Sequence, residues 1–152
     1  MIDPKDLKKQ RLLSDLNDAE LERIARMVGR ETYAKGALVF TEGAATKGIC
    51  LLHSGKVEIS KITPDGWKQT LAVLTEGSFF GELSVIEDRK VHSTNATAID
   101  AVELYRIRTE DFKALEASEP QMMYKVMKTV ARMTSRNIHM MNEKLMKALI
   151  SY

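Results

Sequence analysis

The sequence predicts a mainly β domain, built as a sandwich or barrel of short strands with helices at both ends. Apolar residues recur every three or four positions in residues 1–30 and again from residue 109, which is typical of amphipathic helices. Between residues 31 and 108, short alternating runs are separated by turn residues, which is typical of strands. The chain has 152 residues, 44% of them hydrophobic, so we expect one domain over residues 1–152.

The first expected element is a pair of short helices within residues 1–30. Apolar residues from Leu7 to Val28 keep helical spacing, and this spacing is broken near residues 14–18. Glycine is favoured just past a helix end because it accepts a positive φ angle. We therefore expect the second helix to end at Gly29.

Turn signals bound the strands expected in residues 31–108. The segment Thr63-Pro64-Asp65-Gly66 predicts a turn, since proline fixes one backbone angle and glycine accepts positive φ. One strand should lie between Gly55 and Gly66, and the next should cover residues 68–74. Short strands that repeat about every ten residues argue for a β sandwich or barrel.

Two helices are expected over residues 109–152. Thr109 opens a short helix that has Phe112 and Leu115 on its apolar side. Pro120 then begins a helix of about thirty residues, because proline suits a first helical turn and no helix breaker follows. Residues 121–152 hold six Lys or Arg and one acidic residue, whereas the rest of the chain sums to −3. The long helix is therefore basic and the body slightly acidic.

The long helix has two contrasting faces when its residues are placed 100° apart. One face carries a seam with spacings of four and three, as in coiled coils. The opposite face carries the basic residues and is expected to face solvent. The seam consists of Met127, Ala131, Thr134, Ile138, Met141, Leu145 and Ala148, and the basic stripe of Lys125, Lys128, Arg132, Arg136 and His139, with Lys147 nearby.

Three interpretations of this helix remain open from the residues. The seam could pack on the body of the same chain, or it could pair with a second copy in a homodimer through residues 120–150. The basic stripe could instead bind nucleic acid or an anionic membrane. We favour the homodimer because the seam continues beyond the length that a compact barrel could cover. The stripe has no interleaved aromatic residues, which argues against nucleic acid.

Motifs typical of enzymes and metal sites are absent from the sequence. The phosphate-binding P-loop, the zinc-peptidase motif and the serine-hydrolase elbow do not occur. Three histidines, at positions 53, 92 and 139, lack metal-ligand spacing, so we expect neither an enzyme nor a bound metal. The single cysteine, Cys50, allows no internal disulfide and fits a cytoplasmic setting. No secretory signal and no membrane-inserting run is indicated.

One segment, residues 77–86, concentrates the chemistry. Gly81 suits a turn that leads into a short helix, and the free N–H groups at a helix start attract phosphate. Glu82 could accept hydrogen bonds from sugar hydroxyls beside such a site. A loop with one helical turn and no ligand is the alternative interpretation.

The turn residues and this segment together resemble a known family. Gly36, Glu42-Gly43, Gly55, Gly66, Gly77 and the FGELS run at 80–84, followed by the basic helix, resemble the cyclic nucleotide-binding domain family, including its catabolite-activator-type transcription factors. The resemblance covers roughly residues 12–150. It implies a double-stranded β-helix, or jelly roll, with a phosphate-binding cassette at residues 80–94. It also implies cyclic AMP as the ligand, with cyclic GMP as the alternative.

The resemblance also assigns roles to residues. Glu82 would hold the ribose 2′-hydroxyl, and the backbone amides of residues 81–84 would line the phosphate together with Ser93. Polar residues of the long helix, here Thr134 and Ser135, would close over the base. The expected ligand-binding set is Phe80, Gly81, Glu82, Leu83, Ser84, His92, Ser93, Thr94, Thr134 and Ser135.

Two positions depart from the family pattern. His92 stands where the family supplies an arginine to the phosphate, and Val91 stands where many relatives have proline. Losing a charged bidentate contact costs about 1.5–3 kcal/mol, or roughly ten- to over a hundredfold in affinity. Because an imidazolium restores the charge, affinity should rise as the pH falls below about 6.5.

Two functional hypotheses follow from the match and its departure. The chain is a cyclic nucleotide sensor that signals through its C-terminal helix, or it is a degenerate fold that binds no nucleotide and serves dimerisation or protein interaction. Transcription factors of the family carry a helix-turn-helix domain after the long helix. The chain reaches Tyr152 without one, so direct nucleic-acid binding is not expected.

Overall fold

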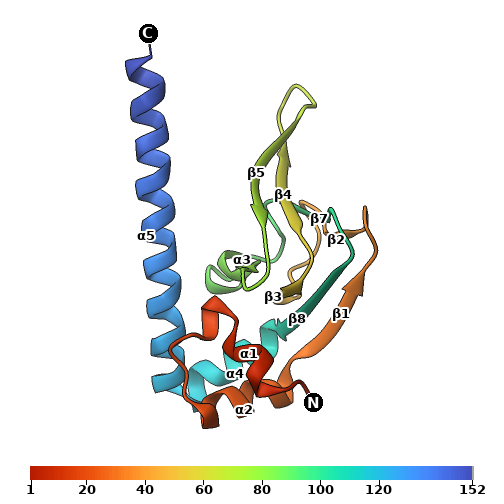
Figure 1. Cartoon of the computed structure of the whole chain (residues 1–152), viewed down its shortest axis with the longest axis vertical. Helices are drawn as coiled ribbons and strands as arrows, with labels where there is room; N and C mark the ends of the chain where they lie inside the picture. The colour runs from red at the N-terminus through yellow and green to blue at the C-terminus, as the bar shows by residue number, and fades with distance from the viewer. Residues whose placement is uncertain (152) are drawn as a thin grey trace.

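The protein is described by a computed structural model that covers residues 1–151. Eight strands form two four-stranded antiparallel sheets, in the orders β1-β8-β3-β6 and β2-β7-β4-β5 (Figure 1). The strands are β1 (Gly29–Tyr33), β2 (Leu38–Phe40), β3 (Gly48–Ser54), β4 (Val57–Ile62), β5 (Lys68–Leu74), β6 (Phe79–Phe80), β7 (Asn95–Ala98) and β8 (Val102–Arg108).

The helices lie at the two ends of the chain, as expected, except for the short α3 between β6 and β7. They are α1 (Pro4–Lys8), the 3₁₀ turn η1 (Arg11–Leu13), α2 (Asp18–Met27), α3 (Glu82–Ile86), α4 (Thr109–Ser118) and α5 (Pro120–Ile150). The two sheets with a long C-terminal helix confirm the jelly-roll prediction. The turn at residues 63–66 is also confirmed, since Gly66 has φ 87° and its N–H donates to the Thr63 carbonyl at 2.9 Å.

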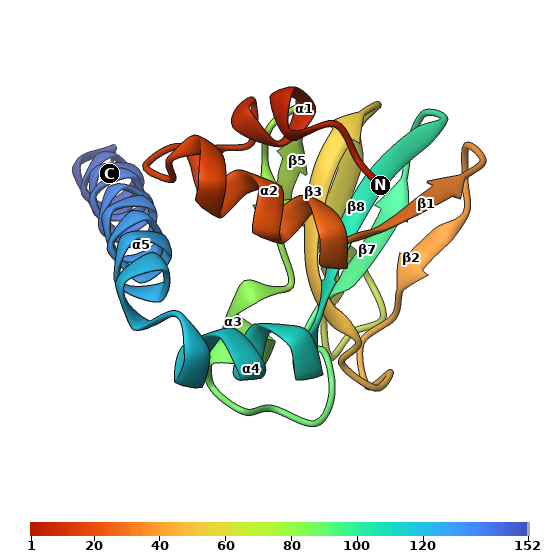
Figure 2. The ribbon, with the colours of Figure 1, turned by 90° about the horizontal axis from the view of Figure 1, so that it is seen from below.

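Two hydrophobic clusters lie on the two opposite faces of the sheet β1-β8-β3-β6. Residues that alternate along its strands point to opposite faces, because side chains change face at every step of a strand. Leu52 and Leu104 pack towards the other sheet, whereas Leu51 and Tyr105 pack against the helices. Figure 2 shows α1, α2 and α4 gathered on the helix side of this sheet.

The N-terminal helices differ from the expectation at two points. The first predicted helix is split into α1 and η1, and α2 ends at Met27 without using Gly29 as its cap. Gly29 is instead the first residue of β1, and its φ is not positive. The start of α2 is fixed by a capping box, in which Asn17 and Glu20 each accept the other's backbone N–H at 2.9 Å.

The long helix α5 is packed on the body only near its start. Its buried residues are Met122, Met123, Val126, Thr129 and Val130, which are not the residues of the predicted seam. The seam is exposed further along, where Ile138, Met141 and Leu145 keep more than half of their surface. The body therefore covers a neighbouring face of α5 together with Met127, the first residue of the seam, and leaves the distal part of the seam open.

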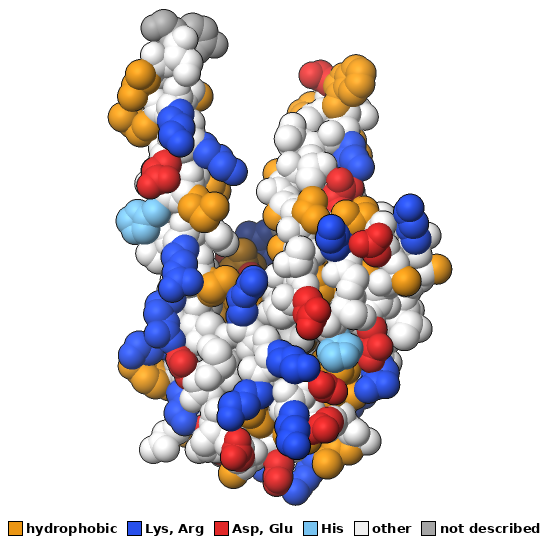
Figure 3. All heavy atoms as spheres, viewed as in Figure 1, with side chains coloured by type: hydrophobic (Ala, Val, Ile, Leu, Met, Phe, Trp, Pro, Cys, Tyr) orange, Lys and Arg blue, Asp and Glu red, His pale blue; other side chains and the backbone are white. Residues whose placement is uncertain are grey.

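The basic stripe faces solvent as expected, except that Lys125 is partly buried, and two of its residues form ion pairs with the body. Lys125 Nζ lies 2.7 Å from Glu20 Oε1, and Arg132 is paired with Asp15. Both acidic residues belong to the N-terminal segment against which α5 packs. The remaining basic side chains lie along the exposed side of α5 (Figure 3). Within residues 1–151, no helix combines the length and apolar character needed to cross a bilayer.

Candidate functional site

The segment from Gly81 to the end of α3 has the geometry that its sequence predicts. Gly81 precedes α3 in the left-handed region, with φ 80° and ψ 0°. A side chain there would be strained, and its Cβ would come within 3.1 Å of the Gly48 carbonyl oxygen. No side chain of residues 1–151 caps the start of α3. The N–H groups of α3 that follow Glu82 are thus open to an acceptor from outside the chain.

Glu82, in the first turn of α3, carries a carboxylate in a poorly hydrated position. Burial raises its pKa above the ordinary value, and its own backbone N–H acts in the opposite direction. No other side chain within residues 1–151 forms a hydrogen bond or ion pair with it. Such a carboxyl group is suited to bind hydroxyl donors of a ligand.

The loop after α3 is held by backbone contacts and one ion pair. Asp88 has a positive φ of 54°, and the Arg89 N–H donates to the Ser84 carbonyl at 2.8 Å. Asp88 Oδ1 lies 2.6 Å from Lys113 Nζ of α4. Arg89 Nε lies 2.5 Å from Glu87 Oε2, so its charge is already paired. Arg89 therefore does not supply a free cation to the start of α3 in this conformation.

His92 lies in the interior with its ring against an aromatic partner. It is 3% exposed, and its ring stacks on that of Phe40 with centroids 3.6 Å apart and planes 8° apart. Its Cε1 lies 3.8 Å from the position that a Cβ on Gly81 would take. The structure thus brings His92 close to Gly81, in a fixed stack.

The surroundings of His92 favour the neutral imidazole. Burial lowers its pKa below 6.5, and the positive charge of Arg106 lowers it further. The imidazolium therefore forms only at a more acidic pH than the sequence suggested. At neutral pH, His92 offers one N–H donor and no charge.

The other expected site residues fall into two groups. Phe80, Leu83, Ser84, Ser93 and Thr94 belong to the cassette at 80–94, with Phe80 and Ser84 buried and Leu83 47% exposed. Thr134 and Ser135 lie on α5, and no hydrogen bond between described residues joins them to the cassette. Their role over a base stays a prediction.

The segment 41–46 is a part of the site that the sequence reasoning missed. His92 N–H donates to the Ala44 carbonyl at 2.9 Å, and Gly43 N–H donates to the His92 carbonyl at 2.9 Å. Thr46 N–H donates to the Lys90 carbonyl at 3.0 Å. These bonds attach the cassette to β2 and place Phe40 against His92. The local sequence around Phe40, an aromatic residue in a short strand, did not indicate its contact with His92.

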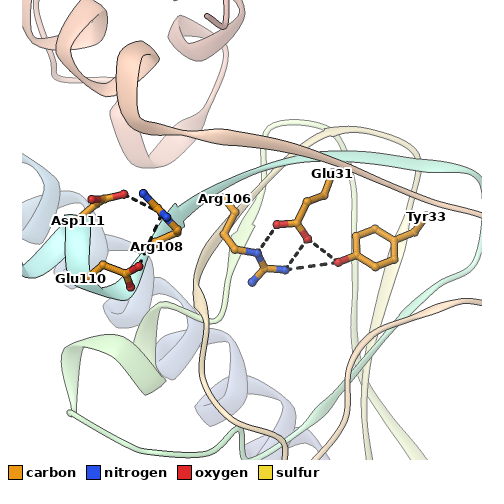
Figure 4. A network of polar contacts seen from close by, with 6 residues as sticks. All are labelled: Glu31, Tyr33, Arg106, Arg108, Glu110 and Asp111. Carbon is orange, nitrogen blue, oxygen red and sulfur yellow. Dashed lines mark hydrogen bonds and ion pairs between the residues drawn. The ribbon is translucent and has the colours of Figure 1, made fainter.

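A buried ion pair near His92 was also missed. Arg106 Nε and Nη2 donate to the two Glu31 oxygens at 2.5 and 3.0 Å, and Tyr33 Oη donates to Glu31 at 2.6 Å (Figure 4). The Arg106 hydrogen bonds hold the pKa of Glu31 below its usual range. A signal did exist, since Arg106 shares one face of its strand with the buried apolar residues Val102 and Leu104.

The chain is similar to several proteins of known family. The family model for the cyclic nucleotide-binding domain matches residues 30–119. The chain is 29% identical to a cyclic AMP receptor protein of Thermus thermophilus over 126 residues, 83% of this chain and 58% of that one. It is 28% identical to glutaminase 1 of Bradyrhizobium diazoefficiens over 140 residues, 92% of this chain and 22% of that enzyme. The chain thus spans between about a fifth and three fifths of these two relatives.

A solved structure shows the same arrangement of strands and helices. The Thermus thermophilus catabolite activator protein matches with a TM-score of 0.76 and 28% identity, over 90% of this chain and 62% of that one. The matched family model covers more than half of the chain and includes the whole of residues 80–94. This chain belongs to the cyclic nucleotide-binding domain family.

Proposed function

We propose that the chain is a cyclic nucleotide-sensing regulatory module that binds cyclic AMP and signals through α5. The observation that carries the proposal is the left-handed Gly81 before α3, with open N–H groups, beside the unpaired Glu82. Amide donors suit the cyclic phosphate and the carboxylate suits a ribose hydroxyl. The family and the name of the Thermus relative support cyclic AMP over other ligands.

Recognition of the phosphate would rest on backbone amides and Ser93 and not on a cation. His92 is neutral at pH 7, and Arg89 is paired with Glu87. We therefore expect weaker binding than in relatives that have arginine, by roughly ten- to a hundredfold.

The first test measures the unfolding midpoint with and without millimolar cyclic AMP. A ligand that binds only the folded state raises the midpoint. Glu82→Gln should remove most of the rise, because a neutral amide accepts fewer hydrogen bonds from the ribose. Glu76→Gln, which removes an equal charge from an exposed turn, is the matched control and should respond as the unchanged chain does. A full rise in Glu82→Gln would contradict the assigned role of Glu82.

A second test uses the lowered pKa of His92. The unfolded chain binds a proton at His92 near pH 6.5, whereas the folded chain does so only at lower pH. The free energy of unfolding should therefore fall as the pH drops below about 6.5, by up to about 1 kcal/mol at pH 5.5. His92→Gln should flatten this slope, and His139→Gln, on the exposed part of α5, should keep it. Equal slopes in all three proteins would refute a neutral, buried His92.

The second candidate function is that of a degenerate fold, which binds no nucleotide. It is favoured by the stacking of the His92 ring on Phe40, which holds His92 in a fixed position. His92→Arg separates the two candidates by calorimetric titration with cyclic AMP. A working cassette should gain roughly tenfold or more in affinity from the restored charge. No binding by either protein, with unshifted midpoints for cyclic AMP and cyclic GMP, would leave the interaction or dimerisation role.

We also propose that the seam of α5 forms a homodimer and that signals pass along this helix. Support comes from the open seam, with Ile138, Met141 and Leu145 each more than half exposed. A distal helix segment that is free of the body can pair with a second copy in register. Amide hydrogen exchange over residues 131–150 should change on addition of cyclic AMP if α5 transmits binding. Unchanged exchange at saturating ligand would exclude that route.

A further inference from the structure

Two cavities that share wall residues lie along β1, β2 and β8, and the smaller one borders the candidate nucleotide site at Phe40, Ala44 and His92. Their volumes are about 420 and 250 Å³, and the walls of both include Val39, Lys47 and Arg106. The cassette residues 81–84 and Ser93 line neither of them. We call this space the Arg106 cavity. It does not include the first turn of α3, although its smaller part shares His92 with the candidate nucleotide site.

The inner part of the Arg106 cavity is positively charged. The wall of the smaller cavity includes Lys47 and Arg106 and no Asp or Glu. The larger cavity does include Glu31 and Glu110. However, Glu31 is bound to Arg106, and Glu110 lies 3.7 Å from Arg108 Nε. Arg108 is shared between Glu110 and the nearer Asp111, at 3.1 Å. Lys47, which is exposed, forms no ion pair within residues 1–151, so it supplies the unpaired cation at the mouth of the cavity.

The same cavity contains hydrogen-bonding groups that lack partners. Arg106 is 6% exposed and uses Nε and Nη2 for Glu31, whereas Nη1 has no partner among the described residues (Figure 4). Thr46, in the wall of the larger cavity, has a buried hydroxyl without any partner. Buried polar groups are normally satisfied, so the Thr46 hydroxyl is an exception. Arg106 Nη1 is not one of the fully buried atoms without a partner.

From the unpaired cation and the unpaired donors, we infer that the Arg106 cavity binds a small oxyanion, a phosphate or carboxylate group. Lys47 supplies the charge, and Arg106 Nη1 and the Thr46 hydroxyl supply directed hydrogen bonds. Phe40 and His92 belong to the wall of the smaller cavity and close it towards the cassette. A bound oxyanion would satisfy the polar groups that the chain itself leaves open.

The test uses inorganic phosphate and succinate as probes at constant ionic strength, with chloride as the reference. Each probe that binds should raise the unfolding midpoint. In ¹H–¹⁵N spectra, the Arg106 Nε–H and the amides of Thr46 and Lys47 should shift on titration. Lys47→Gln should weaken the response about tenfold or more. Lys35→Gln, on the exposed turn before β2, should keep it.

Three results would overturn the inference. One is the absence of any midpoint rise beyond that in chloride for both probes. Another is an equal response in Lys47→Gln and in the unchanged chain. The third is a set of phosphate-induced shifts centred on the amides of residues 81–84, which would place the anion in the nucleotide site. Failure of cyclic AMP binding leaves all three results unaffected, so the two proposals are tested separately.

Discussion

The two ends of α5 share one helical pattern and have opposite environments. Near Pro120, the helix buries Met122 and Val126 against η1 and α4, at 1% and 2% exposure. Towards Ile150, its apolar residues are open, with Met141 at 68%. In Figure 3 the upper part of α5 stands apart from the β4–β5 hairpin, with open space between them. The contrast shows that helical periodicity alone does not say which surface covers an apolar stripe.

The difference has a simple geometric cause. The body packs on α5 only along the first third of the helix, where Thr129 and Val130 are the last buried residues. Beyond them, the β4–β5 hairpin rises beside α5 but stands apart from it (Figure 1). The 31-residue helix is therefore supported by the body only at its start. The distal part of α5 is therefore either exposed to solvent or bound to a partner molecule.

The largest expected effect is a difference in the free energy of unfolding between variants of two methionines, one at each end of α5. Met122→Ala should lower the free energy of unfolding by about 3 kcal/mol, because it leaves a cavity in a packed core. Met141→Ala removes the same atoms from an exposed position and should change the stability of the monomer by less than about 0.5 kcal/mol. Denaturant titration of dilute protein measures both. Similar losses in the two variants would mean that the distal helix is packed as tightly as its base.

A somewhat smaller effect is expected on self-association. Ile138→Asp places a charge in the seam and should weaken the dimer at least about a hundredfold. Met140→Asp is the matched control, since Met140 is 55% exposed but lies outside the seam. Sedimentation equilibrium over a range of concentrations gives both dissociation constants. A monomeric unchanged chain, or equal weakening by the two variants, would rule out the seam as the interface.

The smallest expected effect concerns the ion pairs at the base. Lys125→Met should cost about 1 kcal/mol at low salt and less at high salt, since Lys125 is only 35% exposed beside Glu20. Lys144→Met, on the distal part, should cost less than about 0.3 kcal/mol. Thermal unfolding at two salt concentrations measures the difference. If Lys144 proves as important as Lys125, the distal helix is in contact with another surface.

The candidate site, like α5, has parts that could be predicted from the sequence and parts that could not. Gly81, Glu82 and the short helix α3 could be predicted because their chemistry is local, in a turn, a helix start and one carboxylate. The environment of His92 could not, because Phe40 and Arg106 reach it from other strands. Its lowered pKa follows from burial, which local sequence does not encode.

The sequence by itself determined the elements and the family. Alternation and turn residues placed β4 and β5, and glycine at position 81 set the start of α3, because these features depend on neighbours in the chain. The tertiary structure alone decided which face of α5 is buried, why Gly29 begins a strand, and how Arg106 is paired with Glu31. Those outcomes depend on contacts between residues far apart in sequence, and such contacts leave little trace in local periodicity.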